Sequence, residues 1–137
     1  MEQKQRYTLG KAERLKSRKL IEQLFKEGKS FSVQPIRVYW MLQPPVDKTK
    51  PHLQFGVAAG TKHFKHAVDR NRIKRLIREA YRLQKNDLQQ QLAAADLHLN
   101  VFFIFTGKEV PDYNLVFEKT GIALQKLSEI CVQSASA

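Results

Sequence analysis

The stretch 61-TKHFKHAVDRNRIKRLIREAYRLQK-85 determines how the rest of the chain is interpreted. Residues 62–85 hold nine Lys or Arg against two acidic residues, a net charge of +7. Drawn as a helix from about Ala67, the segment separates into an apolar side and a basic side. The apolar side has Ile73, Leu76, Ile77, Ala80 and Leu83, and the basic side has Arg70, Asn71, Lys74, Arg75, Arg78, Arg82 and Lys85. Ion pairs within a helix, such as Arg75 with Glu79, contribute only about 0.2–0.5 kcal/mol. We therefore expect an external polyanion to neutralise the basic side.

Length and composition predict a single domain. A chain of 137 residues can bury a core without disulfides or metals. No apolar run approaches the roughly 20 residues that a membrane span requires, and the first residues lack the apolar segment of a secretory signal. With one cysteine, Cys131, no internal disulfide can form. We expect a cytoplasmic protein whose residues 1–137 form one domain, with residues 1–8 and 132–137 disordered.

The net charge of +11 is concentrated in two regions. Residues 1–29 contribute +5 and residues 62–85 contribute +7, which leaves −1 for the remainder. Clustered Lys and Arg favour nucleic acid, because binding to phosphates releases counterions. An anionic membrane would attract the same charge, but a helix on a membrane surface needs free apolar residues. Here the apolar side of 67–85 is needed for the core, so we expect no membrane partner.

Periodicity and breaker residues predict an α+β sandwich in the order α-β-β-β-α-β-α, with helices packed on a mixed four-stranded sheet. Ser17 is the expected N-cap of the first helix and Asp112 that of the last, while Gly28 ends the first. We expect strands 36–43 and 53–59 to form a hairpin, with a loose loop at 45–51. The predicted helices are 15–28, 67–85 with an Ala-rich extension to 96, and 112–130, and the predicted strands are 29–33, 36–43, 53–59 and 97–105.

The side chains of the predicted strand 36–43 differ between its two faces. Ile36, Val38, Trp40 and Leu42 share one face, and the other face has Arg37, Tyr39 and Met41. Aromatic and basic groups on one face can stack on bases and meet phosphate. Ordinary sheet packing with a snorkelling arginine explains the same pattern.

One motif is specific. The run Arg70-Asn71-Arg72-Ile73-Lys74-Arg75, followed by Arg78, resembles the RNR signature of the bacterial ribonuclease P protein component. Segments 15–28, IRVYW, FGVAAGTK and FFIF are similar to that family's elements and stand in the same order. The resemblance implies a protein subunit that binds a catalytic RNA, one protein per RNA, and promotes 5′ maturation of precursor tRNA.

The resemblance also implies two binding sites and no catalytic residue in the protein. Hydrolysis would belong to Mg²⁺ ions held by the RNA, and the protein itself would bind no metal. The single-stranded 5′ leader of precursor tRNA would lie in a cleft between the first helix and the sheet. The residues implied for the leader cleft are Ile21, Phe25, Arg37 and Tyr39. The residues implied for the catalytic RNA are Lys62, Arg70, Asn71, Arg72, Lys74, Arg75 and Arg78.

Other interpretations have less support. A structural or ribosome-associated RNA-binding protein would explain the charge but not the RNR motif. A protein nuclease would need converging carboxylates, whereas Asp47, Asp69, Asp87, Asp96 and Asp112 are scattered. His63 and His66 have metal-binding spacing without a third ligand nearby in sequence, so we expect them to face phosphate.

Overall fold

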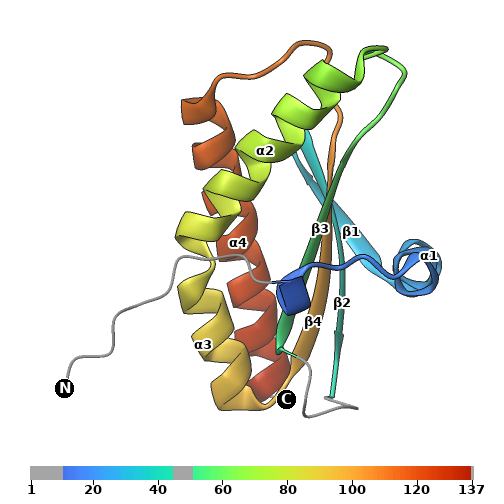
Figure 1. Cartoon of the computed structure of the whole chain (residues 1–137). Coiled ribbons are helices and arrows are strands. Elements are labelled where there is room, and N and C mark those ends of the chain that lie inside the picture. Colours follow the sequence, from blue (N-terminus) through green and yellow to red (C-terminus); the bar gives the residue numbers. More distant parts are fainter. Residues whose placement is uncertain (1–10, 45–50, 137) are drawn as a thin grey trace.

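A mixed sheet of four strands divides the molecule into two unequal layers (Figure 1). The computed structural model describes residues 11–44 and 51–136. The strands β1 and β2 are antiparallel, as are β2 and β4, whereas β3 runs parallel to β4. In the sheet they follow the order β1-β2-β4-β3. Their bounds are Lys29–Val33 (β1), Ile36–Gln43 (β2), Leu53–Ala59 (β3) and His98–Phe105 (β4).

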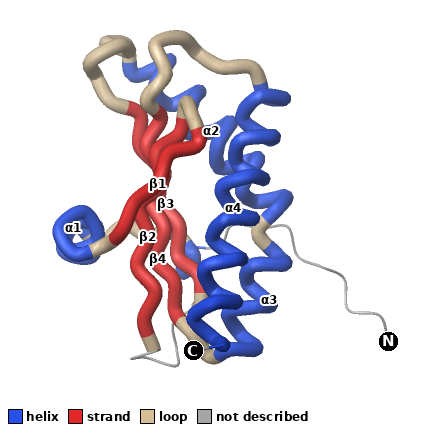
Figure 2. Tube along the Cα trace, turned by 180° about the vertical axis from the view of Figure 1, so that it is seen from behind, coloured by secondary structure: helices blue, strands red, loops and turns tan. Residues whose placement is uncertain are grey.

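Three helices cover one face of the sheet and a single short helix lies on the other (Figures 1 and 2). The α2, α3 and α4 helices span Ala67–Gln84, Asn86–Ala95 and Tyr113–Ser136, and α1, alone on the opposite face, spans Arg18–Glu27. A short 3-10 turn, η1 (Lys11–Glu13), precedes α1. The predicted fold class and order are confirmed. Among the helices of the described residues, none is long and apolar enough to cross a membrane.

The apolar strand β4 explains why the predicted hairpin between β2 and β3 is wrong. β4 lies between these two strands and pairs with both. Seven of its eight residues are buried, so a central position removes more apolar surface from water than an edge would. The hairpin that does form joins β1 to β2. Most of the 45–51 loop lies outside the described residues, as do residues 1–8.

The larger core lies between the sheet and the three-helix layer. Leu99, Val101 and Phe103 of β4 belong to it, and Tyr81 of α2 stacks on Phe55 of β3 with ring centroids 3.8 Å apart. Ile36 and Val38 are buried in the same core, and Trp40 and Leu42 pack against it, as their alternation predicted. A second, smaller cluster forms under α1 around Leu15, Leu24 and Phe102.

Both predicted N-caps are present. Ser17 Oγ accepts a hydrogen bond from the backbone N–H of Leu20 at 3.4 Å, and Asp112 Oδ1 accepts one from Leu115 at 2.8 Å. Gly28 ends α1 as expected. The Ala-rich extension is a separate helix, α3, whose residues Leu88 and Leu92 are buried in the larger core. Residues 132–136, expected to be disordered, continue α4.

The absence of a side chain at Gly56 makes room for Phe102 under α1. A Cβ at this position would lie 2.6 Å from Phe102 Cδ2 and 3.0 Å from the carbonyl oxygen of Leu15. We expect Gly56→Ala to lower the free energy of unfolding by about 1–3 kcal/mol, the usual cost of overpacking. Urea denaturation measures the change.

Gly60→Ala is the matched control, because a Cβ there meets nothing within 4 Å. Equal stability of the two variants would show that the space beside Phe102 is not limiting.

Candidate nucleic-acid interface

Helix α2 presents the basic face that the sequence predicted. Its buried residues are Ile73, Ile77, Ala80 and Tyr81, which follow helical spacing and pack in the larger core. Most of the predicted site residues lie on the opposite side. Lys62, Asn71, Arg72, Arg75 and Arg78 are exposed, and Arg70 and Lys74 are half-buried. The structure therefore brings this set together on one helix and the loop that leads into it.

The C-terminal end of the predicted pattern needs correction. Lys85 does not belong to the basic face: its side chain is 2% exposed and its Nζ lies 2.5 Å from Glu13 Oε1. Leu83, expected in the core, is 38% exposed. Both lie where α2 gives way to α3, so a helical pattern extended to residue 85 misplaces them.

Glu79 pairs with a different arginine from the one expected. It accepts hydrogen bonds from Arg82, three residues later, and no salt bridge with Arg75 is found among the described residues. The hydrogen bond from Arg82 is the main cause of a lowered pKa at Glu79, with smaller contributions from the charges of Arg82 and Arg75. Arg75 thus stays exposed, and its charge acts on Glu79 without forming a salt bridge.

Arg70 has a structural role in addition to its charge. Its Nη1 donates to the carbonyl oxygens of Phe64 at 2.7 Å and Lys65 at 2.9 Å. These bonds hold the loop before α2 against the first turn of the helix, while Phe64 is buried below. A guanidinium has five N–H donors, so Arg70 can fix this loop and still offer donors to a phosphate. The sequence motif gave no sign of this second role.

A second surface lies between α1 and the sheet. Phe25 of α1 makes edge contacts with Tyr39 of β2 and Phe102 of β4, with ring centroids 4.8 and 5.4 Å apart. The guanidinium of Arg37 lies 5.4 Å from the centre of the Tyr39 ring. Ile21 packs against the same cluster. The four residues predicted for a leader cleft therefore share one surface, and Phe25 is 42% exposed on it.

Phe102 is the residue of this surface that sequence reasoning missed. It lies in the apolar run 101–105 of β4. Alternation along the strand was the available signal, because residues 99, 101, 103 and 105 face the larger core while 102 and 104 face α1. Arg37 makes a further contact on this surface, donating to Ser30 Oγ of β1 at 3.3 Å.

The basic face extends beyond α2. The pKa of Arg78 is lowered, first by partial burial and second by the positive charge of Arg14. Arg14 is exposed and follows η1. This electrostatic contact between Arg14 and Arg78 extends the group of cations from α2 to the residue that follows η1.

No metal centre accompanies these surfaces in the described part of the chain. His63 and His66 are both exposed there, and no three His, Cys, Asp or Glu side chains gather in 11–44 or 51–136. Asp47 lies outside those ranges. Burial raises the pKa of the Cys131 thiol to about 11, so at neutral pH this group is a protonated packing residue and a poor nucleophile.

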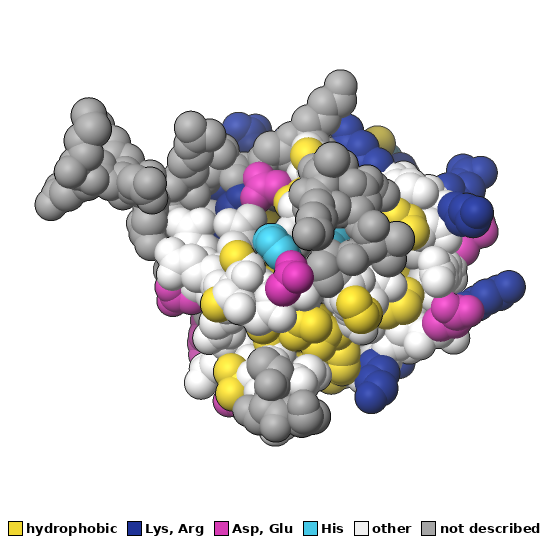
Figure 3. All heavy atoms as spheres, turned by 90° about the horizontal axis from the view of Figure 1, so that it is seen from below, with side chains coloured by type: hydrophobic (Ala, Val, Ile, Leu, Met, Phe, Trp, Pro, Cys, Tyr) yellow, Lys and Arg dark blue, Asp and Glu magenta, His cyan; other side chains and the backbone are white. Residues whose placement is uncertain are grey.

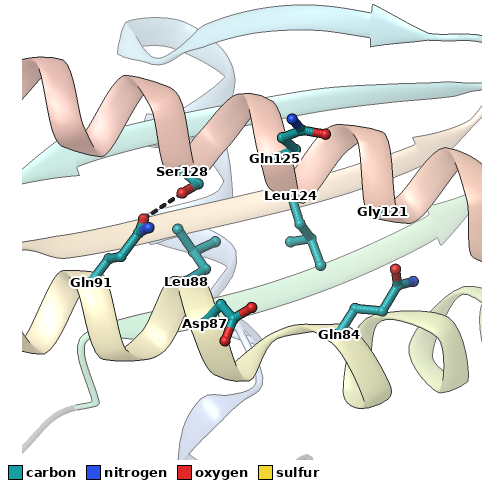
Figure 4. Close-up of a pocket in the computed structure, with 8 residues that line it drawn as sticks. All are labelled: Gln84, Asp87, Leu88, Gln91, Gly121, Leu124, Gln125 and Ser128. Carbon is teal, nitrogen blue, oxygen red and sulfur yellow. Dashed lines mark hydrogen bonds between the residues drawn. The ribbon is translucent and has the colours of Figure 1, made fainter.

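A hollow that the sequence did not predict lies between α3 and α4 (Figure 4). Its volume is about 390 Å³, and Gln84, Asp87, Leu88 and Leu124 are among its lining residues. Ser128 Oγ donates to Gln91 Oε1 across it at 2.5 Å. Amides and one carboxylate can hydrogen-bond a ligand but provide no nucleophile with an adjacent base.

Positive charge is distributed unevenly over the end of the molecule that Figure 3 shows. Figure 3 views the end of the molecule where the C-terminus lies, and Lys and Arg side chains gather mainly toward the side that carries α1. Hydrophobic and uncharged groups occupy much of the middle. The exposed cations of α1 include Arg18, Lys19 and Lys26. The surface beside Phe25 and Tyr39 therefore lies next to a second group of cations.

Sequence comparisons find proteins of one family that are similar to this chain. The family model described as Ribonuclease P matches residues 9–127. The ribonuclease P protein component of Porphyromonas gingivalis is 38% identical over 110 residues, covering 80% of this chain and 79% of that protein. The Chlorobium phaeobacteroides component is 31% identical over 133 residues, covering 90% and 91%.

A solved structure shows the same fold. The Staphylococcus aureus RNase P protein superposes with a TM-score of 0.64 at 23% identity, covering 85% of this chain and 96% of that one. The family model spans most of the chain, and both relatives exceed 30% identity over more than two thirds of it. The chain therefore belongs to the ribonuclease P protein component family, whose members serve as the protein subunit of ribonuclease P in tRNA processing.

Proposed function

We propose that this subunit binds two RNA segments at once, the catalytic RNA on the basic face of α2 and the 5′ leader of precursor tRNA in the cleft beside α1. The observation that carries the proposal is the chemical difference between the two surfaces. One is a helix face of cations, suited to the phosphates of a folded RNA. The other combines aromatic rings with Arg37, suited to unstacked bases of a single strand.

The residues of α2 fit contacts with folded RNA. Arg72, Arg75 and Arg78 are exposed and can each pair with phosphate oxygens through a planar guanidinium. Asn71 lies on the same side and can donate and accept at a base edge or a 2′-hydroxyl. Because phosphate contacts carry no sequence information, these cations would set affinity and orientation.

The cleft beside α1 fits a single-stranded leader. Phe25 offers an exposed ring, Tyr39 lies at its edge, and Arg37 provides a charge within reach of the backbone of a stacked strand. Stacking on aromatic rings tolerates any base, as recognition of leaders of differing sequence requires. In this proposal Mg²⁺ ions held by the RNA carry the hydrolysis, and the protein's residues position the substrate.

We expect purified protein to increase cleavage of precursor tRNA by a bacterial ribonuclease P RNA at low Mg²⁺ concentration. Neutralising phosphates with bound cations reduces the metal concentration that the RNA needs for compaction and substrate binding. Initial rates with and without protein, measured across a Mg²⁺ titration, test this. Folded protein that leaves the rates unchanged would contradict the proposal.

Charge removal tests the face of α2. The double variant Arg72→Gln/Arg75→Gln should lower the slope of log K against log salt for binding the catalytic RNA by about 1.4–1.8, which is 0.7–0.9 for each lost phosphate contact. Fluorescence anisotropy over a salt series measures the slope.

The matched control is Lys119→Gln/Lys126→Gln, which removes the same charge from α4. Lys126 lies over the Phe31 ring of β1, away from α2. If both pairs reduce the slope equally, the effect is one of net charge and the face of α2 is not the contact surface.

Substitution of Tyr39 tests the cleft. Tyr39→Ala should weaken binding of the assembled protein–RNA complex to precursor tRNA by about tenfold, since base stacking contributes about 1–3 kcal/mol, and leave mature tRNA almost unaffected. Tyr39→Phe, which retains the ring, should bind both tRNAs normally. Equal losses for precursor and mature tRNA would indicate a packing defect under α1.

A further inference from the structure

The residues just before α1 form an arm along the free edge of the sheet. The strand β3 is an edge strand, and residues 12–15 pair with it. Leu15 N–H donates to the Phe55 carbonyl oxygen at 2.8 Å, Gln54 Nε2 donates to the Ala12 carbonyl oxygen at 3.1 Å, and Arg14 forms a parallel bridge with Phe55. We call residues 12–15 the edge arm. Because Leu15 is buried under α1, the arm leads from the α2 layer to the α1 layer.

A buried ion pair holds the start of the edge arm. Glu13 Oε1 lies 2.5 Å from Lys85 Nζ and also accepts from Gln89 Nε2 at 2.5 Å. The Lys85 side chain is 2% exposed and that of Glu13 is 19% exposed. A lysine is rarely so buried without a partner, and removing one member of such a pair leaves an uncompensated charge. The arm is therefore fixed to the junction of α2 and α3 by a strong and directional contact.

The direction of the edge arm places Arg14 beside the basic face of α2. The arm runs parallel to β3, and α2 returns in the opposite direction over the same strand (Figure 1). Glu13 contacts Lys85 at the end of α2, and the chain runs from Glu13 to Arg14 toward the start of α2. Arg78 lies two helical turns before Lys85 on the same side of the helix. Consistent with this path, the charge of Arg14 contributes to the lowered pKa of Arg78.

We infer that Arg14 is a further phosphate-binding residue, which continues the basic face of α2 toward the α1 cleft, and that Glu13, Lys85 and Gln89 are its positioning residues. This inference rests on the proposed function and deepens it. The phosphate backbone of the catalytic RNA is the ligand. The pair of Arg14 and Arg78 gives a phosphate two cations from separate parts of the chain, and the buried ion pair removes the freedom that Arg14 would otherwise have at the edge of the sheet.

The first test removes the charge of Arg14. Arg14→Gln should lower the salt slope for binding the catalytic RNA by about 0.7–0.9 and weaken binding about three- to tenfold at physiological salt. Lys126→Gln, which removes one charge from α4, should leave the slope unchanged. Since Arg14 is exposed, its substitution does not disturb the core.

The second test removes Glu13, for which the edge arm and the net charge predict opposite changes in RNA affinity. Glu13→Ala raises the net charge by one unit, so general electrostatics would strengthen RNA binding. Because the edge arm loses its anchor, we expect weaker binding and a salt slope reduced to that of Arg14→Gln. The double variant Glu13→Ala/Arg14→Gln should then bind as Arg14→Gln does, since Glu13 acts through Arg14.

The outcomes separate the two proposals. If Arg72→Gln/Arg75→Gln lowers the slope and Arg14→Gln does not, the inference on the edge arm is overturned and the proposed function stands. If neither lowers it, the proposed function fails. Additive losses in the double variant, or stronger binding by Glu13→Ala, would overturn the positioning role. Glu13→Gln, which removes the ion pair with Lys85 but keeps the size of the side chain, replaces Glu13→Ala if circular dichroism shows that the alanine variant is unfolded, and the same criteria then apply to it.

Discussion

The burial of β4 on both faces is the constraint on which the rest of the structure depends. A strand with the sequence HLNVFFIF cannot leave either side in water, so both faces of the sheet need a cover. On one side the cover is the layer of α2, α3 and α4, and on the other it is α1 with Leu15 and Phe102. Each cover brings a basic helix with it. The two surfaces to which the proposed function assigns RNA thus result from packing a single apolar strand.

The fold class could be predicted from local patterns, but the strand order could not. Helical spacing in 67–84, the caps at Ser17 and Asp112, and the alternation of 36–43 are local signals, and all appear in the structure. Strand pairing depends on contacts between segments that are distant in the sequence. The short separation between β2 and β3 in the sequence suggested a hairpin. The greater apolar content of β4 instead determines its central position, and a local pattern does not compare the burial that the two arrangements would give.

The basic helix shows a similar limit at the level of single residues. Periodicity correctly assigned the buried residues Ile73 and Ile77 and the exposed residue Arg75. It failed for Lys85, because the partner of that lysine is 72 residues away, in η1. It also failed to show that Arg70 holds the preceding loop through two backbone carbonyls. Charge in a sequence indicates where cations are, but not which of them the fold neutralises.

These internal contacts determine which cations remain for RNA. Glu79 engages Arg82 and Glu13 engages Lys85, so two of the nine positive charges in residues 62–85 have acidic partners within the protein. Both pairs lie at the C-terminal end of α2. The cations left exposed lie from Lys62 to Arg78, toward the start of the helix, where the partial positive charge of the N-terminus adds to their field. The fold thus concentrates positive charge without a salt bridge to Glu13 or Glu79 toward the start of α2. In the proposed function, that end of the helix attracts the phosphate backbone of RNA, because clustered cations and the helix N-terminus act in the same direction.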